Sequence, residues 1–393
     1  MRIAENNCRE SPQSPPVVRR CPICADEGLK NRYVAKEMVN GTRETFDYLL
    51  CAACGTLYLV KPPADIGPYY ASYYSTKNMA ASPPIKNSLK KRVKNRLCRI
   101  AMKHLGRLYP VKPPADLAPI VASYYSTKNM ASPPIKNSFQ KRVKNKLRRI
   151  AMKHLGGPVS KMLDRWVALP PQAGFQALYR LKLSADDAIL DVGCGDGTMV
   201  GALDRIGFTH VCGCDPFITQ EKTFDNGARL LKSELSGVPG VWDLIMLHHC
   251  FEHVPNPAAT ARMICEKLKP GGLCLLRFPN VDSVEFTRYG ENWWGLHAPR
   301  HYFLLSQKAL KLVWQATGMH IEQIWCDSQP DHYIYSYEYM LNLAETDPGS
   351  VRALWDKSPL WNNLERDHIA HNVPWYNEHL IGDWIVYLLR KDH

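Results

Sequence analysis

Residues 189–197 read Ile-Leu-Asp-Val-Gly-Cys-Gly-Asp-Gly, an apolar run followed by three glycines at alternate positions. This pattern predicts a buried strand that enters a tight turn and then a helix, because glycine allows the turn and lets the backbone approach a ligand closely. Asp215 stands 20 residues beyond Gly195, at the end of the next apolar run, where a carboxylate can bind ribose hydroxyls. We therefore expect an open α/β sheet that binds an adenosine-containing ligand at Asp191, Gly193, Cys194, Gly195, Gly197 and Asp215.

The spacing of the glycines distinguishes between such ligands. The dinucleotide fingerprint G-x-G-x-x-G has a small third residue, and Thr198 occupies that position here. The pattern D-x-G-C-G-x-G instead resembles motif I of class I S-adenosylmethionine (SAM) methyltransferases. Residues 241–255 resemble the fourth strand and following loop of that family, and residues 268–280 resemble its fifth strand. The resemblance implies a Rossmann-like, doubly wound, seven-stranded sheet with SAM as cofactor. The alternative is a generic Rossmann-like domain that binds another ligand or none.

Four cysteines form a second motif near the N-terminus. Cys21 and Cys24 make one C-x-x-C pair, and Cys51 and Cys54 make another after a gap of 26 residues. This spacing is typical of a four-cysteine zinc site in a small ribbon. A stretch of about 40 residues builds little core, so the metal would supply its folding energy. Because four thiolates leave no open position, the expected role of Zn²⁺ is structural; a redox pair is the weaker alternative, since neither C-x-x-C opens a helix in a βαβ unit.

A near-identical tandem repeat separates the two motifs. Residues 57–106 recur as residues 108–156, which indicates a recent duplication or an error in the gene model. Each copy contains a basic stretch with eight lysines and arginines and no acid, and without these sixteen charges the net charge of +13 becomes −3. The apolar residues of each stretch fall on one helical face. Such a helix binds nucleic acid or an anionic membrane in some proteins, but we favour a solvated face packed on its own domain.

These features divide the chain into three predicted parts: a zinc ribbon at 17–58, a duplicated basic helical linker at 59–157, and a methyltransferase domain at 158–393 with an aromatic-rich insertion at about 330–380. No apolar run approaches the roughly 20 residues that span a bilayer. Residues 1–20 are polar and do not resemble a signal peptide. Thirteen cysteines in such a chain favour a reducing compartment, so we expect a cytoplasmic protein.

The loop after the predicted fourth strand carries candidate catalytic residues. His249, Glu252 and His253 fit the pattern H-x-x-E-H of inverzincin proteases, but that site needs a helix, and here the pattern follows a strand and ends at a proline. In the methyltransferase interpretation His253 is a general base with a near-neutral pKa, or a structural imidazole. His249 is expected to contact the cofactor. Glu234, just after a candidate third strand at 228–232, is either an adenine-side contact or a solvated loop residue.

A second polar cluster follows the predicted fifth strand. Residues 294–301 resemble the W-G-x-x-x-P-R-H segment of a bacterial methyltransferase group with N-terminal four-cysteine zinc ribbons, some of whose members act on sugars or other small metabolites. The resemblance makes His297 and His301 candidate catalytic residues. In the alternative interpretation, Trp293 and Trp294 pack the core and Arg300 caps a loop. Tyrosines at 333, 335, 337 and 339 recur with period two and suggest a lid.

The absence of two motifs restricts the kind of atom that is expected to accept the methyl group. No [DNS]-P-P-[YF] follows the fourth strand, and no Pro-Cys pair stands there or after the fifth, which disfavours methylation of amines and of pyrimidine carbons. We therefore expect methyl transfer to an oxygen or carbon of a small-molecule acceptor, with sugars among the candidates. The alternatives are an RNA methyltransferase that binds RNA through the ribbon and the basic helices, and an inactive zinc-ribbon scaffold. The intact nucleotide motif argues against the scaffold.

Overall fold

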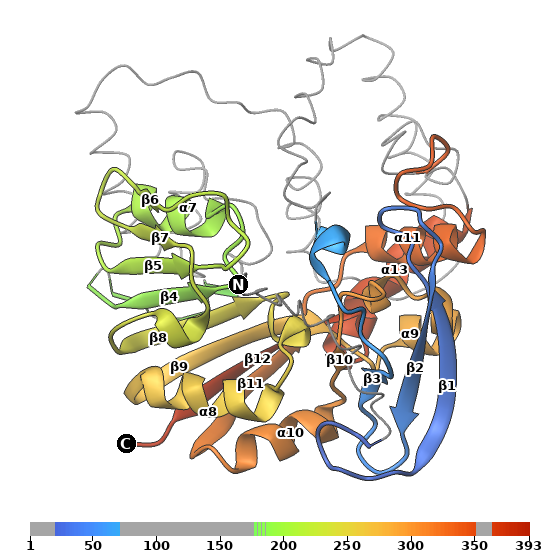
Figure 1. Cartoon of the computed structure of the whole chain (residues 1–393), viewed down its shortest axis with the longest axis horizontal. Coiled ribbons are helices and arrows are strands. Elements are labelled where there is room, and N and C mark those ends of the chain that lie inside the picture. The colour runs from blue at the N-terminus through green and yellow to red at the C-terminus, as the bar shows by residue number, and fades with distance from the viewer. Residues whose placement is uncertain (1–19, 71–176, 179, 182, 185, 351–363) are drawn as a thin grey trace, which may run out of the picture.

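The computed structural model describes residues 20–70, 177–350 except 179, 182 and 185, and 364–393 (Figure 1). Most of the duplicated segment 59–157 lies outside these residues, so its basic helices stay a prediction. Within the described part of the chain, no helix has the length and apolarity needed to cross a membrane.

An eight-stranded sheet forms the centre of the larger part of the molecule, in the order β11-β12-β9-β8-β4-β5-β7-β6. The five neighbouring strands β9, β8, β4, β5 and β7 pair in parallel. The short β6 runs antiparallel to β7, and β12 runs antiparallel to both β9 and β11. The sheet therefore contains the seven predicted strands, of which β12 is the antiparallel one between β9 and β11, and β6 adds an eighth. Their bounds are β4 Ile189–Val192, β5 Val211–Cys214, β6 Lys222–Thr223, β7 Arg229–Leu231, β8 Trp242–His248, β9 Leu268–Pro279, β11 Met319–Cys326 and β12 Trp384–Lys391.

Helices cover both faces of this sheet because side chains alternate along each strand. Leu190, Ile245 and Leu276 pack with α8 (Pro257–Lys267) and α10 (Gln307–Gln315) on one face. Ile189 and Leu244 pack with α7 (Thr198–Ile206) on the other face. This is the doubly wound α/β arrangement that the motifs predicted, and it brings the carboxyl ends of β4, β5, β8 and β9 to one edge.

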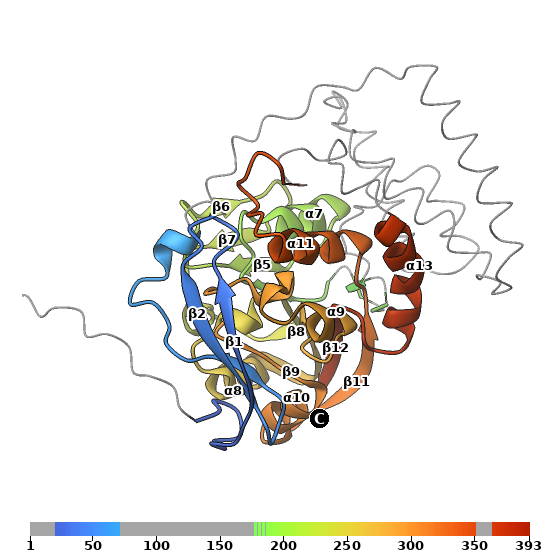
Figure 2. The same ribbon diagram turned by 90° about the vertical axis from the view of Figure 1, so that its right-hand side faces the viewer.

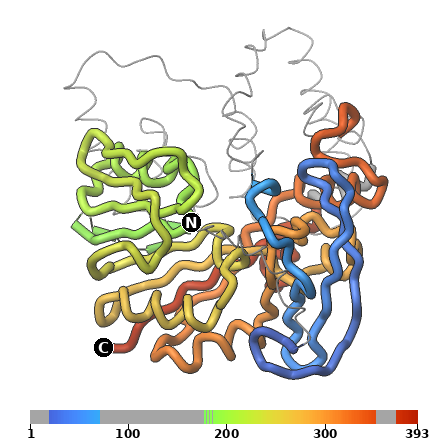
Figure 3. Tube along the Cα trace, viewed as in Figure 1, coloured from blue at the N-terminus to red at the C-terminus, as the bar shows by residue number. Residues whose placement is uncertain are grey.

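The N-terminal ribbon shares a sheet with the rest of the chain. β1 (Leu29–Lys36), β2 (Thr45–Cys51) and β3 (Leu57–Leu59) form an antiparallel sheet, and β10 (Phe303–Leu304) adds its fourth strand. Phe303 pairs with Tyr58, and Leu304 pairs with Leu57. Figures 2 and 3 show the ribbon lying along the side of the larger part. The sequence suggested two separate units at this point, whereas the backbone joins them through one ladder.

Helices occupy the segment before the closing strand. α9 (Val284–Tyr289) follows β9, while α11 (Pro330–Met340) and α13 (Leu364–Glu378) lie between β11 and β12. The tyrosines with period two belong to α11, where Tyr333, Tyr335 and Tyr339 are buried. Residues two apart on a helix point in different directions, so they form no single aromatic face. The suggestion of a lid is therefore not supported: three of these rings are core residues.

Candidate functional site

The glycine loop after β4 has the conformation that its sequence requires. Gly193, Gly195 and Gly197 have φ values of 70°, 54° and 74°, in the left-handed region that favours glycine. A Cβ on Gly193 would lie 2.5 Å from Cys250 Sγ, whereas a Cβ on Gly195 would meet no heavy atom within 4 Å. Cys194 turns its thiol toward β5, as a Cβ built on Gly213 would lie 2.8 Å from its Sγ. The loop therefore offers backbone, at Gly195 above all, to a ligand.

Two buried carboxylates stand beside this loop. Asp191 lies in β4, and Asp215 directly follows the neighbouring strand β5. Asp215 Oδ2 accepts a hydrogen bond from Gly195 N at 3.1 Å, and its Oδ1 accepts one from Phe217 N at 2.8 Å. Burial, and then the charge of Asp215, raises the pKa of Asp191 to about 7. The structure thus brings the predicted loop and Asp215 together at the carboxyl edge of the sheet.

The raised pKa of Asp191 predicts that the folded state becomes less stable as the pH rises from about 4 to about 7. Over this range the folded chain retains a proton that the unfolded chain has released, so unfolding becomes easier with increasing pH. Asp191→Asn removes this dependence. Between pH 5 and pH 7.5, we expect the free energy of unfolding of wild type to fall by about 3 kcal/mol more than that of the variant.

Urea unfolding at both pH values, with zinc present throughout, measures this difference. Asp196→Asn is the matched control, since Asp196 is an exposed residue of the same loop. Parallel shifts of wild type and Asp191→Asn with pH would contradict the assignment.

Glu234, a predicted cofactor contact, lies at the surface after β7. It follows β7 and precedes a 3-10 turn at Leu235–Gly237, and its side chain is exposed. The position at the carboxyl end of a parallel strand is compatible with an adenine-side contact, which stays a prediction.

Three predicted histidines meet beyond the end of β8. His253 closes a 3-10 turn, Phe251–His253, and its ring centroid lies 4.7 Å from that of His301. The ring of His297 stacks on His301 at 5.3 Å. His253 Nδ1 lies 2.9 Å from the carbonyl oxygen of Arg300 and 2.9 Å from the hydroxyl of Tyr70. The two segments identified from the sequence, 249–253 and 294–301, therefore build one cluster.

Glu252 lies at the centre of this cluster. Its side chain is 1% exposed, and its Oε1 lies 3.4 Å from His249 Nδ1 and 3.9 Å from His301 Nε2. Burial raises the pKa of Glu252 to about 8 and lowers the pKa of His253 to about 4, while those of His249 and His301 fall well below the usual value. The imidazoles are thus neutral at physiological pH. The pKa of His253 is lower than the near-neutral value that the sequence suggested.

His249 belongs to the histidine cluster rather than to the glycine loop. Its Nε2 accepts a hydrogen bond from Arg277 at 2.5 Å, and its ring lies 4.3 Å from that of Trp384. The residue has a φ of 51° and follows β8 directly, so His249 and His253 do not share an α-helix. The helical zinc-protease geometry is therefore absent from this segment.

Tyr70 also belongs to this site, although no sequence pattern predicted it. The ring of Tyr70 stacks on Phe217 at 5.3 Å, and its hydroxyl contacts His253. Phe217 stands two residues after Asp215, so Tyr70 links the loop beside the predicted cofactor site to the histidine cluster. Arg300, a neighbour of the cluster, donates to the carbonyl of Tyr69 at 2.9 Å. No local pattern marks Tyr70, since it lies 183 residues from His253 in the sequence.

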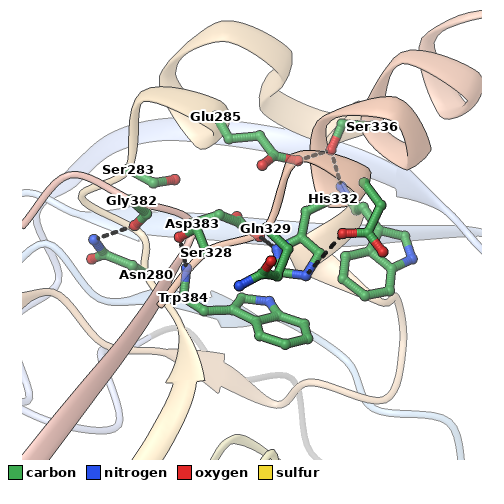
Figure 4. A network of polar contacts seen from close by, with 12 residues as sticks. Asn280, Ser283, Glu285, Ser328, Gln329, His332, Ser336, Gly382, Asp383 and Trp384 are labelled. Carbon is green, nitrogen blue, oxygen red and sulfur yellow. Dashed lines mark hydrogen bonds and ion pairs between the residues drawn. The ribbon is translucent and has the colours of Figure 1, made fainter. Parts of the chain in front are cut away.

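A buried polar network supports the adjacent sheet edge (Figure 4). Asp383 Oδ1 accepts a hydrogen bond from Trp293 Nε1 at 2.5 Å, and its Oδ2 lies 3.1 Å from His332 Nδ1. The ring of His332 lies 3.8 Å from that of Trp384. Trp293 is fully buried, so the packing interpretation holds for it. The network fixes Trp384, which carries Arg277 over its face at 4.0 Å.

The four ribbon cysteines converge on one point. Their Sγ atoms lie within 4.8 Å of one another, and the Cys21 to Cys54 and Cys24 to Cys51 distances are both 3.5 Å. Tetrahedral zinc with Zn–S bonds of about 2.3 Å places its sulfurs about 3.8 Å apart. The cysteines therefore fit a zinc ion. Ser306, at the start of α10, donates to the carbonyl of Cys54 at 2.5 Å and ties this end of the ribbon to the larger part.

In comparisons with known proteins, the chain is similar to methyltransferases. Residues 165–324 match the family model described as "Methyltransferase domain". The ubiquinone biosynthesis O-methyltransferase of Paraburkholderia xenovorans is 29% identical over 158 residues, which are 34% of this chain and 67% of that protein. The enzyme of the same name from Aeromonas salmonicida is 32% identical over 95 residues, which are 21% of this chain and 40% of that protein. The chain thus spans between two fifths and two thirds of these relatives.

Among solved structures, a complex of the Haloferax volcanii Trm112 methyltransferase activator and a methyltransferase matches with a TM-score of 0.37 and 16% identity. The match covers 56% of this chain and 89% of that one.

Proposed function

The chain carries a class I SAM-dependent methyltransferase domain, and on that premise we propose that the whole protein transfers the methyl group of SAM to an oxygen or carbon of a small metabolite. The observation that carries this proposal is the position of two groups of residues at one edge of the sheet. The glycine loop with Asp215 lies on one side, and the cluster around Glu252 lies on the other, with Tyr70 between them.

On the cofactor side, Asp215 would bind the ribose hydroxyls of SAM through its carboxylate, and the backbone at Gly195 would lie along the ligand. The methyl group of SAM is already electrophilic. The protein must therefore hold an acceptor in line with the sulfur–methyl bond and provide for the loss of a proton from the acceptor. Neutral His253, fixed by Tyr70 and by the carbonyl of Arg300, is the proposed group for that proton.

On the acceptor side, an oxygen nucleophile is favoured over carbon, because the matched relatives are named as O-methyltransferases. Trp384 and Arg277 lie next to His249 of the histidine cluster, and together the three side chains suit a hydroxylated ring or an anionic group. An RNA acceptor depends on the basic segments, which lie outside the described residues, so we do not propose it. In the ribbon we propose a structural Zn²⁺ held by Cys21, Cys24, Cys51 and Cys54.

A direct test uses purified, zinc-replete protein, with SAM binding measured by calorimetry. The protein is then incubated with SAM and with sugars, phenols or RNA, and formation of S-adenosylhomocysteine is followed by mass spectrometry. We expect saturable binding of SAM and turnover with a hydroxylated small molecule. A folded protein that fails to bind SAM would overturn the proposal, and turnover with RNA alone would replace its acceptor class.

The position of Tyr70 yields a further prediction. Tyr70→Phe keeps the ring on Phe217 but removes the hydroxyl that contacts His253. We expect kcat/KM for the acceptor to fall about tenfold, the loss of about one hydrogen bond, with SAM affinity unchanged. Tyr69→Phe is the matched control, because its hydroxyl bonds the exposed Glu44. Equal effects of the two substitutions would place Tyr70 outside the site.

A further inference from the structure

We propose that Glu252, His253 and His301 bind a divalent transition-metal ion, separate from the ion of the ribbon. One ligand atom from each of these residues lies within 4.8 Å of the other two. They come from two segments, the 3-10 turn after β8 and the loop before β10, so the cluster is formed by the fold and not by a local repeat. The ion would take two imidazole nitrogens and one carboxylate.

His301 and Glu252 present buried acceptor atoms to each other, and a cation between them would satisfy both. His301 Nδ1 lies 2.8 Å from the carbonyl oxygen of Gly295, which can only accept, so Nδ1 carries the hydrogen. Nε2 therefore presents a lone pair, 3.9 Å from Glu252 Oε1. Neither carboxylate oxygen of Glu252 has a hydrogen-bond partner among the described residues, although the side chain is 1% exposed. Two acceptors face each other in a buried place.

The separation of these two atoms suits a shared ion. Ligands about 2.1 Å from zinc stand about 3.4 Å apart in tetrahedral geometry. The 3.9 Å between His301 Nε2 and Glu252 Oε1 needs only a small inward movement to reach that value. A proton on Glu252 is the competing explanation, and the experiment below distinguishes the two.

The surroundings of the cluster match those of known metal ligands. A metal-bound histidine usually donates its other ring N–H to a carbonyl or carboxylate. His301 does so to Gly295, and Nδ1 of His253 lies 2.9 Å from the carbonyl oxygen of Arg300. The carboxylate lies beside a third imidazole: His249 Nε2 accepts from Arg277, so Nδ1 carries the hydrogen and faces Glu252 at 3.4 Å. Carbonyl groups therefore orient the two candidate imidazole ligands, and the carboxylate between them has no hydrogen-bond partner among the described residues.

The ligand set indicates a site with open positions. Two histidines and one carboxylate are typical of catalytic zinc and of non-haem iron, whereas the four ribbon thiolates form a closed site. The role of the ion rests on the proposed function. An acceptor hydroxyl bound to the ion would lose its proton to water more readily. Its oxygen lone pair then forms the bond to the methyl carbon of SAM, while the electron pair of the breaking carbon–sulfur bond stays on sulfur. His253 acts in this case as a ligand and not as the proton acceptor.

Metal content measures the site without any activity assay. The full-length chain is purified, saturated with Zn²⁺, freed of excess metal by gel filtration and analysed by mass spectrometry. We expect two ions per chain in wild type and one in Glu252→Gln and in His301→Ala. His320→Ala, which removes an exposed histidine of β11, is the control and should retain two. Thermal melting confirms that each variant is folded, and the near-isosteric Glu252→Gln keeps the test valid if His301→Ala fails to fold.

Cobalt substitution identifies which site each ion occupies. Co²⁺ bound by thiolates gives an intense sulfur-to-metal absorption, which should be the same in wild type and Glu252→Gln. A second equivalent, bound by nitrogen and oxygen, should add a weak visible band in wild type only. One ion per chain in wild type, or a second equivalent that Glu252→Gln retains, would overturn the metal site. Binding of SAM by a one-ion protein would leave the proposed function intact, whereas a two-ion protein that binds no SAM would overturn that function alone.

Discussion

Cys51→Ser is expected to abolish zinc binding in the ribbon and to reduce methyl transfer at least 100-fold, although Cys51 contacts neither SAM nor the histidine cluster. A structural zinc contributes about 10–16 kcal/mol of apparent binding free energy in zinc-finger peptides, comparable to the total stability of a typical domain. Loss of the ion therefore releases β2 and β3. β3 pairs with β10, and Tyr48 of β2 donates to the carbonyl of His301 at 2.9 Å. When the ribbon unfolds, the histidine cluster loses the hydrogen bond from Tyr48 and the pairing of β10 with β3.

Zinc content, a thermal melt and S-adenosylhomocysteine formation measure the three consequences. Cys265→Ser is the matched control: Cys265 lies in α8, and its thiol donates to the carbonyl of Thr317, to which a serine hydroxyl can also donate. Retention of activity by zinc-free Cys51→Ser would show that the ribbon and the site fold independently.

Asp215→Ala should weaken SAM binding about 100-fold or more while leaving the fold intact. Two hydrogen bonds from ribose hydroxyls to a buried carboxylate account for this loss, at about 1.5–3 kcal/mol for each bond to a charged group. The glycine loop also loses the contact from Gly195 N to Asp215 Oδ2.

Calorimetric titration with SAM gives the dissociation constant. Asp196→Ala is the control, because that exposed carboxylate belongs to the same loop and, within the described part of the chain, accepts hydrogen bonds from Thr198. An unchanged dissociation constant for Asp215→Ala would remove Asp215 from the cofactor site.

The parts of the molecule that could be predicted are those encoded over short distances. Gly193 to Gly197 fix their own backbone, the C-x-x-C pairs fix two turns, and continuous apolar runs mark the central strands. The helix α7 after the glycine turn follows from such a local pattern. The spacing from Gly195 indicated Asp215, whereas the family resemblance supplied the significance of the segments containing His253 and His301.

The remaining features depend on contacts between distant residues. Tyr70 reaches His253 across 183 positions, and Tyr48 reaches the carbonyl of His301 across 253. β10 has two residues, too few for any periodic signal, yet it completes the ribbon sheet. The low pKa of His253 also arises from burial, which only the packed structure determines. The sequence therefore predicted which candidate residues lie near the sheet edge but not what surrounds them.

The pairing of β3 with β10 also bears on how this chain tolerates insertions. Because β10 and the bond from Arg300 to the carbonyl of Tyr69 hold the ribbon end, the segment between Tyr70 and Ala177 starts and finishes at anchored positions. For a flexible connection between fixed ends, doubling the length costs only about 0.6 kcal/mol of loop-closure entropy. If the interval between Tyr70 and Ala177 behaves as such a connection, a duplication of some 50 residues imposes little thermodynamic penalty on the folded protein. Selection against such an event would be weak, and a second copy could persist in the gene without a task of its own.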